Sequence, residues 1–173
     1  MKYILKLSLT LFVTTAIVAA ALAGVNAIIG PMIAKINAEK TQKAIAEVLP
    51  GGGEALAITP TDTVKAAYGS ETGYAVQVTP AGFDGTIDMM VGLDKTGKVL
   101  GISIISHTET AGLGAVAAAK TSAGEAFRNQ FSQGTAPYTV GDNVDGLTGA
   151  TITSKAVTQG VNAAVAFVRE VLQ

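Results

Sequence analysis

The pattern of apolar positions begins with a long run near the amino terminus. Residues Leu7 to Ala34 span 28 positions without a formal charge, and large aliphatic side chains recur throughout them. At about 1.5 Å per residue, a helix of this length exceeds the roughly 30 Å of a hydrocarbon core. The run therefore predicts a single transmembrane helix, with residues 1–34 forming a short cytoplasmic tail and the membrane anchor.

A cleaved signal peptide is the alternative explanation of the same run. Lys2 and Lys6 would be its basic start, and an A-x-A cleavage site lies at residues 21–23. Apolar residues continue to Ile33, ten places beyond that site, whereas signal-peptide cores usually run only about 7 to 15 residues, which favours a retained anchor. Lysines flank both ends of the run, but a short basic tail is costly to translocate. We therefore expect a single-pass protein of the inner (cytoplasmic) membrane with its main domain on the extracytoplasmic side.

The rest of the chain alternates between strand-like and helix-like patterns. Helical spacing continues to Leu49 and ends at the Pro-Gly-Gly-Gly sequence of residues 50–53, so residues 35–53 are expected to be a helical extension and a flexible break. Strands followed by helices within residues 54–173 indicate one α+β domain with an antiparallel sheet and flanking helices. The expected strands are residues 64–68, 74–79, 86–93 and 98–106, the expected turn is residues 94–97, and the expected helices are residues 115–131 and a terminal helix beginning near Thr153 or Ser154.

Composition narrows the chemistry that this chain can perform. Charged residues make up only 14% of it, which suits a protein with one segment in lipid. A net charge of −1 leaves no basic field to gather nucleic acid. The absence of cysteine and the single histidine exclude disulfides, thiolate metal sites, iron–sulfur clusters ligated by this chain and multi-histidine metal sites. Redox chemistry would therefore require a borrowed organic cofactor, and we expect no resident metal.

The most informative segment lies at residues 145–154, where a loop enters the terminal helix. The free backbone N–H groups and positive dipole end of such a helix favour a phosphate. Gly149 and Ala150 allow a bulky group to approach the backbone closely. On these residues alone, the alternative is that the hydroxyl group of Thr148, Thr153 or Ser154 merely caps the helix. The hydroxyl groups belong to Thr148, Thr151, Thr153 and Ser154.

The same segment carries a resemblance to a known family. Residues 145–151, Asp-Gly-Leu-Thr-Gly-Ala-Thr, resemble the flavinylation motif of the FMN-binding domain family. Residues 82–87 resemble its Gly-aromatic-x-Gly-x-Ile strand start, and residues 107–114 resemble its H-x-E-T-P-G-L-G loop, with Ala111 in place of proline. In that family a separate flavin transferase attaches FMN through a phosphoester to the threonine of Gly-Ala-Thr. The resemblance therefore implies covalent FMN on Thr151.

The resemblance also implies which residues surround the flavin. The backbone N–H groups of residues 151–154 would bind the phosphate. Phe83, Leu113 and Leu147 would pack against the isoalloxazine. Asp145 is expected to be recognised by the transferase, with a turn cap or a ligand of the metal used in transfer as its alternatives. No catalytic residue is expected. The expected cofactor-binding residues are Thr151, Thr148, Gly149, Ala150, Thr153, Ser154, Leu147, Glu109, Thr110, Leu113 and Gly114.

The roles of three polar side chains, one in this set and two near it, are left with two alternatives each. Glu109 either accepts a hydrogen bond from a flavin N–H or braces its loop. His107 either moves protons during flavin reduction or donates to a backbone carbonyl. Lys155 either pairs with the phosphate or is simply solvated.

Within the family, one anchor followed by one short domain is similar to the G subunit of Rnf-type electron-transport complexes; the related C subunit of sodium-translocating NADH:quinone oxidoreductases is usually longer. The resemblance implies an electron-transfer subunit of an ion-translocating ferredoxin:NAD oxidoreductase. Its partners would be the other membrane and peripheral Rnf subunits, the flavin transferase and membrane lipid. The alternatives are a stand-alone anchored extracytoplasmic FMN electron carrier, or a structural module in which the threonine-rich loop only caps a helix.

Overall fold

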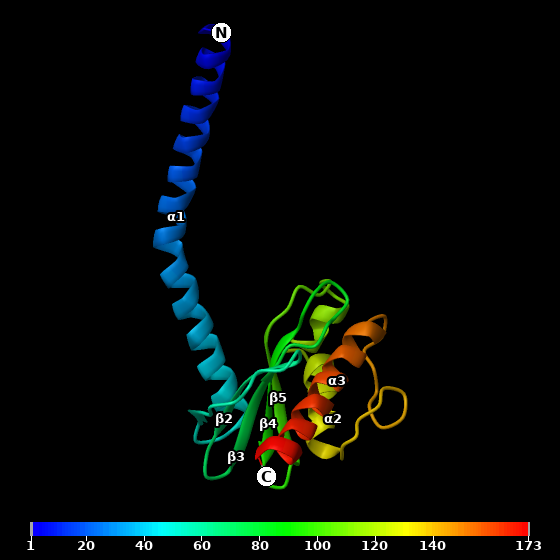
Figure 1. Ribbon diagram of the computed structural model, residues 1–173. Helices are drawn as coiled ribbons and strands as arrows, with labels where there is room; N and C mark the ends of the chain where they lie inside the picture. Colours follow the sequence, from blue (N-terminus) through cyan, green and yellow to red (C-terminus); the bar gives the residue numbers. More distant parts are fainter. Residues whose placement is uncertain (1, 173) are drawn as a thin grey trace. The chain divides into compact units, whose positions relative to one another are not determined.

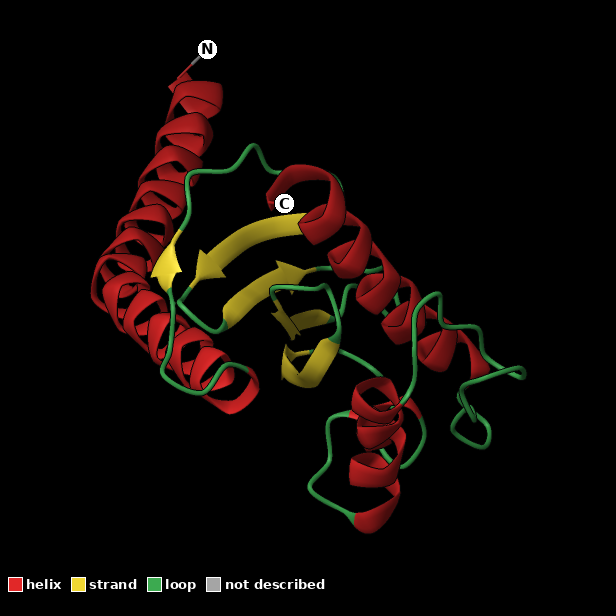
Figure 2. Ribbon diagram, turned by 90° about the horizontal axis from the view of Figure 1, so that it is seen from below, coloured by secondary structure: helices red, strands yellow, loops and turns green. Residues whose placement is uncertain are grey.

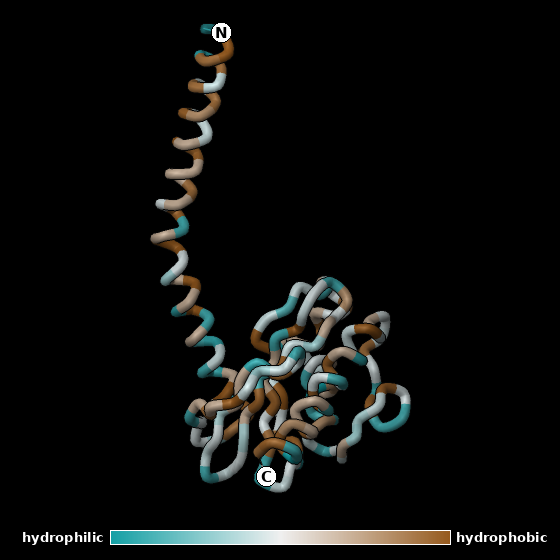
Figure 3. The backbone as a smooth tube through the Cα atoms, viewed as in Figure 1, coloured by the Kyte–Doolittle hydropathy of each residue, from teal (hydrophilic) through white to brown (hydrophobic). Residues whose placement is uncertain are grey.

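The computed structural model describes residues 2–172, which fall into two units, one up to Glu39 and one from Lys40 on. Helix α1 (Lys2–Val48) supplies all of the first unit, and its last turns belong to the second. Among the described residues it is the one helix long and apolar enough to cross a membrane. Figure 3 shows that hydrophobic residues recur along the whole length of this unit. The predicted apolar helix is thereby confirmed.

Hydroxyl groups within the apolar part of α1 are satisfied by the helix itself. Thr10 donates a hydrogen bond to the carbonyl oxygen of Lys6 at 2.8 Å, and Thr15 donates to that of Leu11 at 2.9 Å. Back-bonding of this kind satisfies a hydroxyl in a helix without an outside partner. The threonines therefore do not argue against an apolar environment for the segment.

The second unit is built on one antiparallel sheet in which strands consecutive in sequence are neighbours, in the order β1-β2-β3-β4-β5. The α+β class and the antiparallel sheet are confirmed, and the predicted strands are present to within two residues at each end. A two-residue edge strand was not predicted, because it is too short to show alternation. The strands are β1 (Glu54–Ala55), β2 (Val64–Gly69), β3 (Gly73–Val78), β4 (Asp88–Asp94) and β5 (Val99–Ser106).

The turn between β4 and β5 is held by one carboxylate. Asp94 Oδ1 accepts hydrogen bonds from the backbone N–H groups of Thr96 at 2.8 Å and Lys98 at 2.9 Å, and from the Thr96 hydroxyl at 2.6 Å. Gly97 has a φ of 80°, which favours glycine. The Thr96 hydroxyl, followed by these backbone N–H groups, lowers the pKa of Asp94.

One face of the sheet packs against helices α2 (Ser122–Gln133) and α3 (Thr151–Phe167), and the last turn after α3 is π-helical (Val168–Leu172). Figures 1 and 2 show the two helices beside the sheet. Phe131 forms edge-to-face contacts with Phe127, at 5.6 Å between ring centroids, and with Tyr138, at 5.2 Å. The sheet contributes alternate residues to this main core, including Val76, Val78, Met89, Val91 and Leu93.

The other face of the sheet is covered by the last turns of α1. At Gly92, a Cβ atom would lie 2.2 Å from the carbonyl oxygen of Val48, so only glycine permits this close approach of helix and strand. Ser103 donates a hydrogen bond to Glu47 at 2.7 Å. The buried apolar residues of this second cluster are Ala44, Ile45, Val48, Leu49, Ala75 and Met90.

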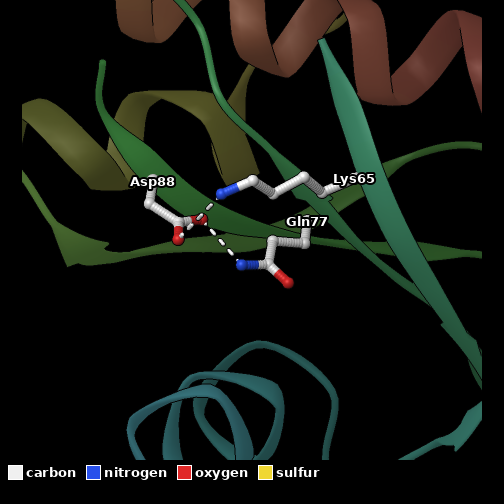
Figure 4. Close-up of polar contacts among 3 residues, drawn as sticks. All are labelled: Lys65, Gln77 and Asp88. Carbon is white, nitrogen blue, oxygen red and sulfur yellow. Dashed lines mark hydrogen bonds and ion pairs between the residues drawn. The ribbon is translucent and has the colours of Figure 1, made fainter. Parts of the chain in front are cut away.

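Three polar side chains, one on each of three neighbouring strands, contact one another. Asp88 accepts a hydrogen bond from Gln77 Nε2 at 2.8 Å and forms an ion pair with Lys65 at 3.7 Å (Figure 4). Lys65 is largely exposed, so we assign this ion pair little stability.

The structure divides one predicted helix and moves the start of another by two or three residues. The helix expected at residues 115–131 is split into a short 3-10 helix, η1 (Gly114–Ala117), and α2. Thr121 caps α2 by accepting from the N–H of Gly124, while Arg128 donates to the carbonyl oxygens of Ala117 and Ala119, so the polar groups freed by the break find partners. The terminal helix begins at Thr151 instead of Thr153 or Ser154, because the hydroxyl groups of those two residues bond elsewhere.

Candidate functional site

Three segments that are far apart in the sequence line one pocket of about 330 Å³. They are the turn before β4, the loop after β5 and the start of α3, which are the three stretches singled out by the motifs. The lining residues are Phe83, Glu109, Thr110, Leu113, Gly114, Gly149, Ala150, Thr151, Ile152 and Thr153.

The amino terminus of α3 opens into this pocket without a side-chain cap. Ala150 is the N-cap residue and has no side chain that could accept a hydrogen bond. The backbone N–H groups of Thr151, Ile152 and Thr153 have no partner within residues 2–172, whereas that of Ser154 is bonded to the Ala150 carbonyl at 2.9 Å. Three donors and the positive end of the helix dipole therefore face the pocket, a combination that favours an anion.

The hydroxyl groups of the loop differ in their availability. Ser154 is buried, accepts from the N–H of Leu147 at 2.9 Å and donates to the carbonyl oxygen of Ala150. Thr153 is also buried and donates to Glu109. Thr148 and Thr151 are exposed, and no hydrogen bond of either side chain occurs in the described part of the chain. Of these two, Thr151 lines the pocket.

Glu109 connects all three segments. Its side chain is only 7% exposed. Oε1 accepts hydrogen bonds from the backbone N–H groups of Phe83 at 2.8 Å and Asp84 at 3.3 Å, while Oε2 accepts from the Thr153 hydroxyl. A Cβ atom at Gly82 would lie 2.3 Å from Oε1, and one at Gly114 would lie 2.6 Å from Oε2. The carboxylate thus braces the two loops against α3 and also borders the pocket.

The pocket has an exposed apolar rim. Phe83 is 66% exposed, Ile152 53% and Leu113 45%. Such exposure of three large apolar side chains around one hollow indicates that something apolar covers them. Ile152 was not predicted from the sequence; its only signal is an apolar residue at an exposed position in the first turn of the helix.

Leu147 and Thr148, two of the expected cofactor-binding residues, do not line this pocket. A second groove, of about 530 Å³, shares Leu113 with the pocket and lies between α2 and residues 145–148. Asp145, Leu147 and Thr148 line this groove and are absent from the lining of the pocket. The remaining lining residues of the groove are Val116, Ala123, Ala126, Phe127, Gln130 and Gly146.

The two basic candidates also lie outside the pocket. Lys155 lines a separate depression with Tyr138 and Thr139. His107 does not line the pocket, and its Nδ1 is buried without a hydrogen-bond partner within the described residues.

Comparison with known proteins gives the class of this domain. The family model of the FMN-binding domain matches residues 82–166, a range that contains all three segments of the pocket. Fold, pocket and family match together define an FMN-binding domain.

Relatives of similar length extend the comparison beyond this domain. The G subunit of the Na⁺-translocating ferredoxin:NAD⁺ oxidoreductase complex of Acetobacterium woodii is 32% identical over 188 residues, covering 95% of this chain and 91% of the relative. The G subunit of the ion-translocating oxidoreductase complex of Methanosarcina acetivorans is 28% identical, covering 96% and 95%. The G subunit of the proton-translocating ferredoxin:NAD⁺ oxidoreductase complex of Clostridium ljungdahlii is 42% identical over 112 residues, covering 60% and 58%. The chain belongs to the family formed by the G subunits of ion-translocating oxidoreductase complexes.

Proposed function

We propose that this chain is the membrane-anchored, FMN-carrying electron-transfer subunit of an Rnf-type ferredoxin:NAD oxidoreductase complex that moves ions across a membrane. The similarity to the G subunit of Acetobacterium woodii along almost the whole of both chains supports this assignment. The FMN-binding domain supplies the redox role, which a chain without cysteine cannot fill by itself. The other subunits of such a complex are its expected partners.

The residues of the pocket fit FMN. The N–H groups of Thr151, Ile152 and Thr153 offer donors to the phosphate, and the exposed Phe83 and Leu113 offer apolar contacts to the ring. When bound there, FMN accepts and releases electrons. The polypeptide binds and orients it, and the buried Glu109 carboxylate places a negative charge at the border of the pocket.

The observation that carries the assignment of the attachment site is the free hydroxyl of Thr151 at the uncapped end of α3. We infer that this hydroxyl is joined to FMN by a flavin transferase. FMN itself offers only water or hydroxide as a leaving group, so the donor must hold FMN in a phosphoanhydride, as flavin adenine dinucleotide (FAD) does. The Thr151 oxygen bonds to the FMN phosphorus, the phosphoanhydride bond breaks, adenosine monophosphate leaves, and the hydroxyl proton is released.

Substitution of the candidate hydroxyls tests this attachment. Thr151→Ala, coexpressed with a flavin transferase, is expected to lose all covalent flavin and to stay folded, because the Thr151 side chain is exposed. Thr148→Ala is the matched control and should retain covalent flavin. Flavin fluorescence in a denaturing gel and the intact mass report the outcome. Fluorescence that persists in Thr151→Ala, or disappears in Thr148→Ala alone, would refute the assignment.

We further propose that residues 1–34 form a cytoplasmic tail and a retained membrane anchor, surrounded by lipid, and that the flavin domain lies on the extracytoplasmic side. The long exposed apolar helix supports the anchor. The boundaries after residues 34 and 53, which separate the anchor, the helical extension and the flavin domain, are part of this proposal. Protease added to intact spheroplasts should remove the flavin domain and leave a membrane-bound fragment. Protection in spheroplasts with digestion in inverted vesicles would reverse the orientation.

A further inference from the structure

The side chain of Gln130 pairs with the backbone of the loop that precedes α3. Its Oε1 accepts a hydrogen bond from the N–H of Asp145 at 2.7 Å, and its Nε2 donates to the carbonyl oxygen of Asp145 at 3.1 Å. Nε2 also lies 3.5 Å from the carbonyl oxygen of Phe127. Both backbone polar groups of one loop residue are thus bonded to a single amide on α2, fifteen residues earlier in the chain.

A second support holds the same loop further along. Ser154 accepts from the N–H of Leu147 at 2.9 Å, and the N–H of Ala150 bonds to the Leu147 carbonyl at 3.0 Å. The carboxylate of Asp145 is exposed and has no hydrogen-bond or ion-pair partner among residues 2–172. Gln130 therefore fixes the backbone of Asp145 while leaving its carboxylate free.

We propose that Gln130 is a positioning residue for the covalent attachment of FMN. It acts through Asp145, whose backbone it fixes so that the Asp145 carboxylate is held in one position relative to the Thr151 hydroxyl. This inference rests on the proposed function, in which Thr151 is the attachment site. A loop that samples several arrangements is competent for only a fraction of the time, so its apparent affinity for the modifying enzyme falls by that fraction.

The chain offers a matched series of substitutions for a test. Gln130→Met removes both hydrogen bonds at similar side-chain length, and Gln130→Glu keeps the acceptor for the N–H of Asp145 while losing the donor. Gln133→Met, at an exposed position on the same helix, makes the same chemical change away from the loop. The full chain, extracted in detergent without flavin, would be incubated with purified flavin transferase, FAD and magnesium. The rate of fluorescence gain in the protein band, measured over a range of chain concentrations, gives kcat and KM.

Gln130→Met is expected to lower kcat/KM for flavin attachment about five- to tenfold, the size expected for losing one or two neutral hydrogen bonds. The loss should appear mainly in KM. Gln130→Glu should lie between the wild type and Gln130→Met, and Gln133→Met should match the wild type. Rates are divided by the folded fraction from circular dichroism, so a purely structural role would leave them unchanged.

A double variant that combines Gln130→Met with Asp145→Ala completes the design. If Gln130 acts through Asp145, adding Gln130→Met to Asp145→Ala should cause no further loss. Equal corrected rates for Gln130→Met and Gln133→Met would overturn the inference, and so would a full additional loss in the double variant. If Gln130→Met does not fold, an unchanged rate in Gln130→Glu overturns it in the same way. The assignment of Thr151 fails separately, through flavin retained in Thr151→Ala.

Discussion

Replacing Glu109 by glutamine removes one charge from the border of the pocket at almost constant shape. In the structure its carboxylate accepts from the N–H groups of Phe83 and Asp84 and from the Thr153 hydroxyl. Hydrogen bonds to a charged group contribute about 1.5–3 kcal/mol each, against about 0.5–1.5 kcal/mol for neutral pairs. An amide also presents NH₂ to one of these three donors. We therefore expect Glu109→Gln to lower the free energy of unfolding by about 2–4 kcal/mol.

The same substitution should change the redox potential of bound FMN. Reduced flavin gains negative charge, which a carboxylate disfavours, so removing the charge should raise the midpoint potential. If the separation from the reduced ring is taken as about 8 Å, a unit charge contributes roughly 2 kcal/mol at an effective dielectric constant of about 20. For a two-electron couple this corresponds to roughly 40 mV.

Two measurements on the detergent-extracted chain check these values. Chemical unfolding followed by circular dichroism gives the stability, and a spectroelectrochemical titration of the flavinylated protein gives the potential. Glu71→Gln is the matched control, because Glu71 is exposed in the turn between β2 and β3 and lies outside the pocket. If Glu109→Gln were indistinguishable from Glu71→Gln in both measurements, the bracing role and the electrostatic role would both be refuted.

Two further predictions concern strand β4 and the turn that follows it, which lie outside the pocket. Gly92→Ala should destabilise the protein by about 1–3 kcal/mol, since the added Cβ would overlap the backbone of Val48. Gly101→Ala is the control and should be nearly neutral, because no atom lies within 4 Å of the added Cβ; thermal unfolding compares the two variants. Because hydrogen bonds lower the folded-state pKa of Asp94, this carboxylate stabilises the fold above its unfolded-state pKa, and the stabilisation is lost as the pH falls through the folded-state value. Asp94→Asn should therefore destabilise the protein modestly at neutral pH and have no effect in acid that protonates Asp94, and a difference that persists in acid would contradict this cause.

The elements that the sequence predicted well are those whose signals are local. The β4–β5 turn follows from Asp94 and Gly97, which lie within four residues of each other, and the strands follow from alternation within single segments. The helix predicted at residues 115–131 failed because alanine-rich sequence suits either outcome, and the break depends on Arg128 reaching back to Ala117 and Ala119.

The same distinction applies to the site. Motif similarity brought together Phe83, Glu109 and Thr151 as residues expected around one cofactor, and the structure places all three around one pocket. The sequence could not decide whether Glu109 contacts the flavin or braces its loop, since the bracing contacts join segments that are far apart in the chain. Glu109 bonds to Thr153, 44 positions later, and this contact occupies a hydroxyl that the sequence offered as a cofactor-binding group.

The packing of the last turns of α1 on the sheet has a practical consequence for dissecting this protein. Ala44, Ile45, Val48 and Leu49 form a layer of the flavin domain itself, although they continue the helix that begins at Lys2. A soluble fragment starting at residue 54 would expose the apolar surface around Ala75 and Met90 to water, where it would favour self-association. A fragment starting at Lys40 keeps that layer. The peptide bond before Lys40 is thus the point at which the amino-terminal apolar helix can be exchanged for a different tether, whereas the helical turns that follow must be kept with the domain.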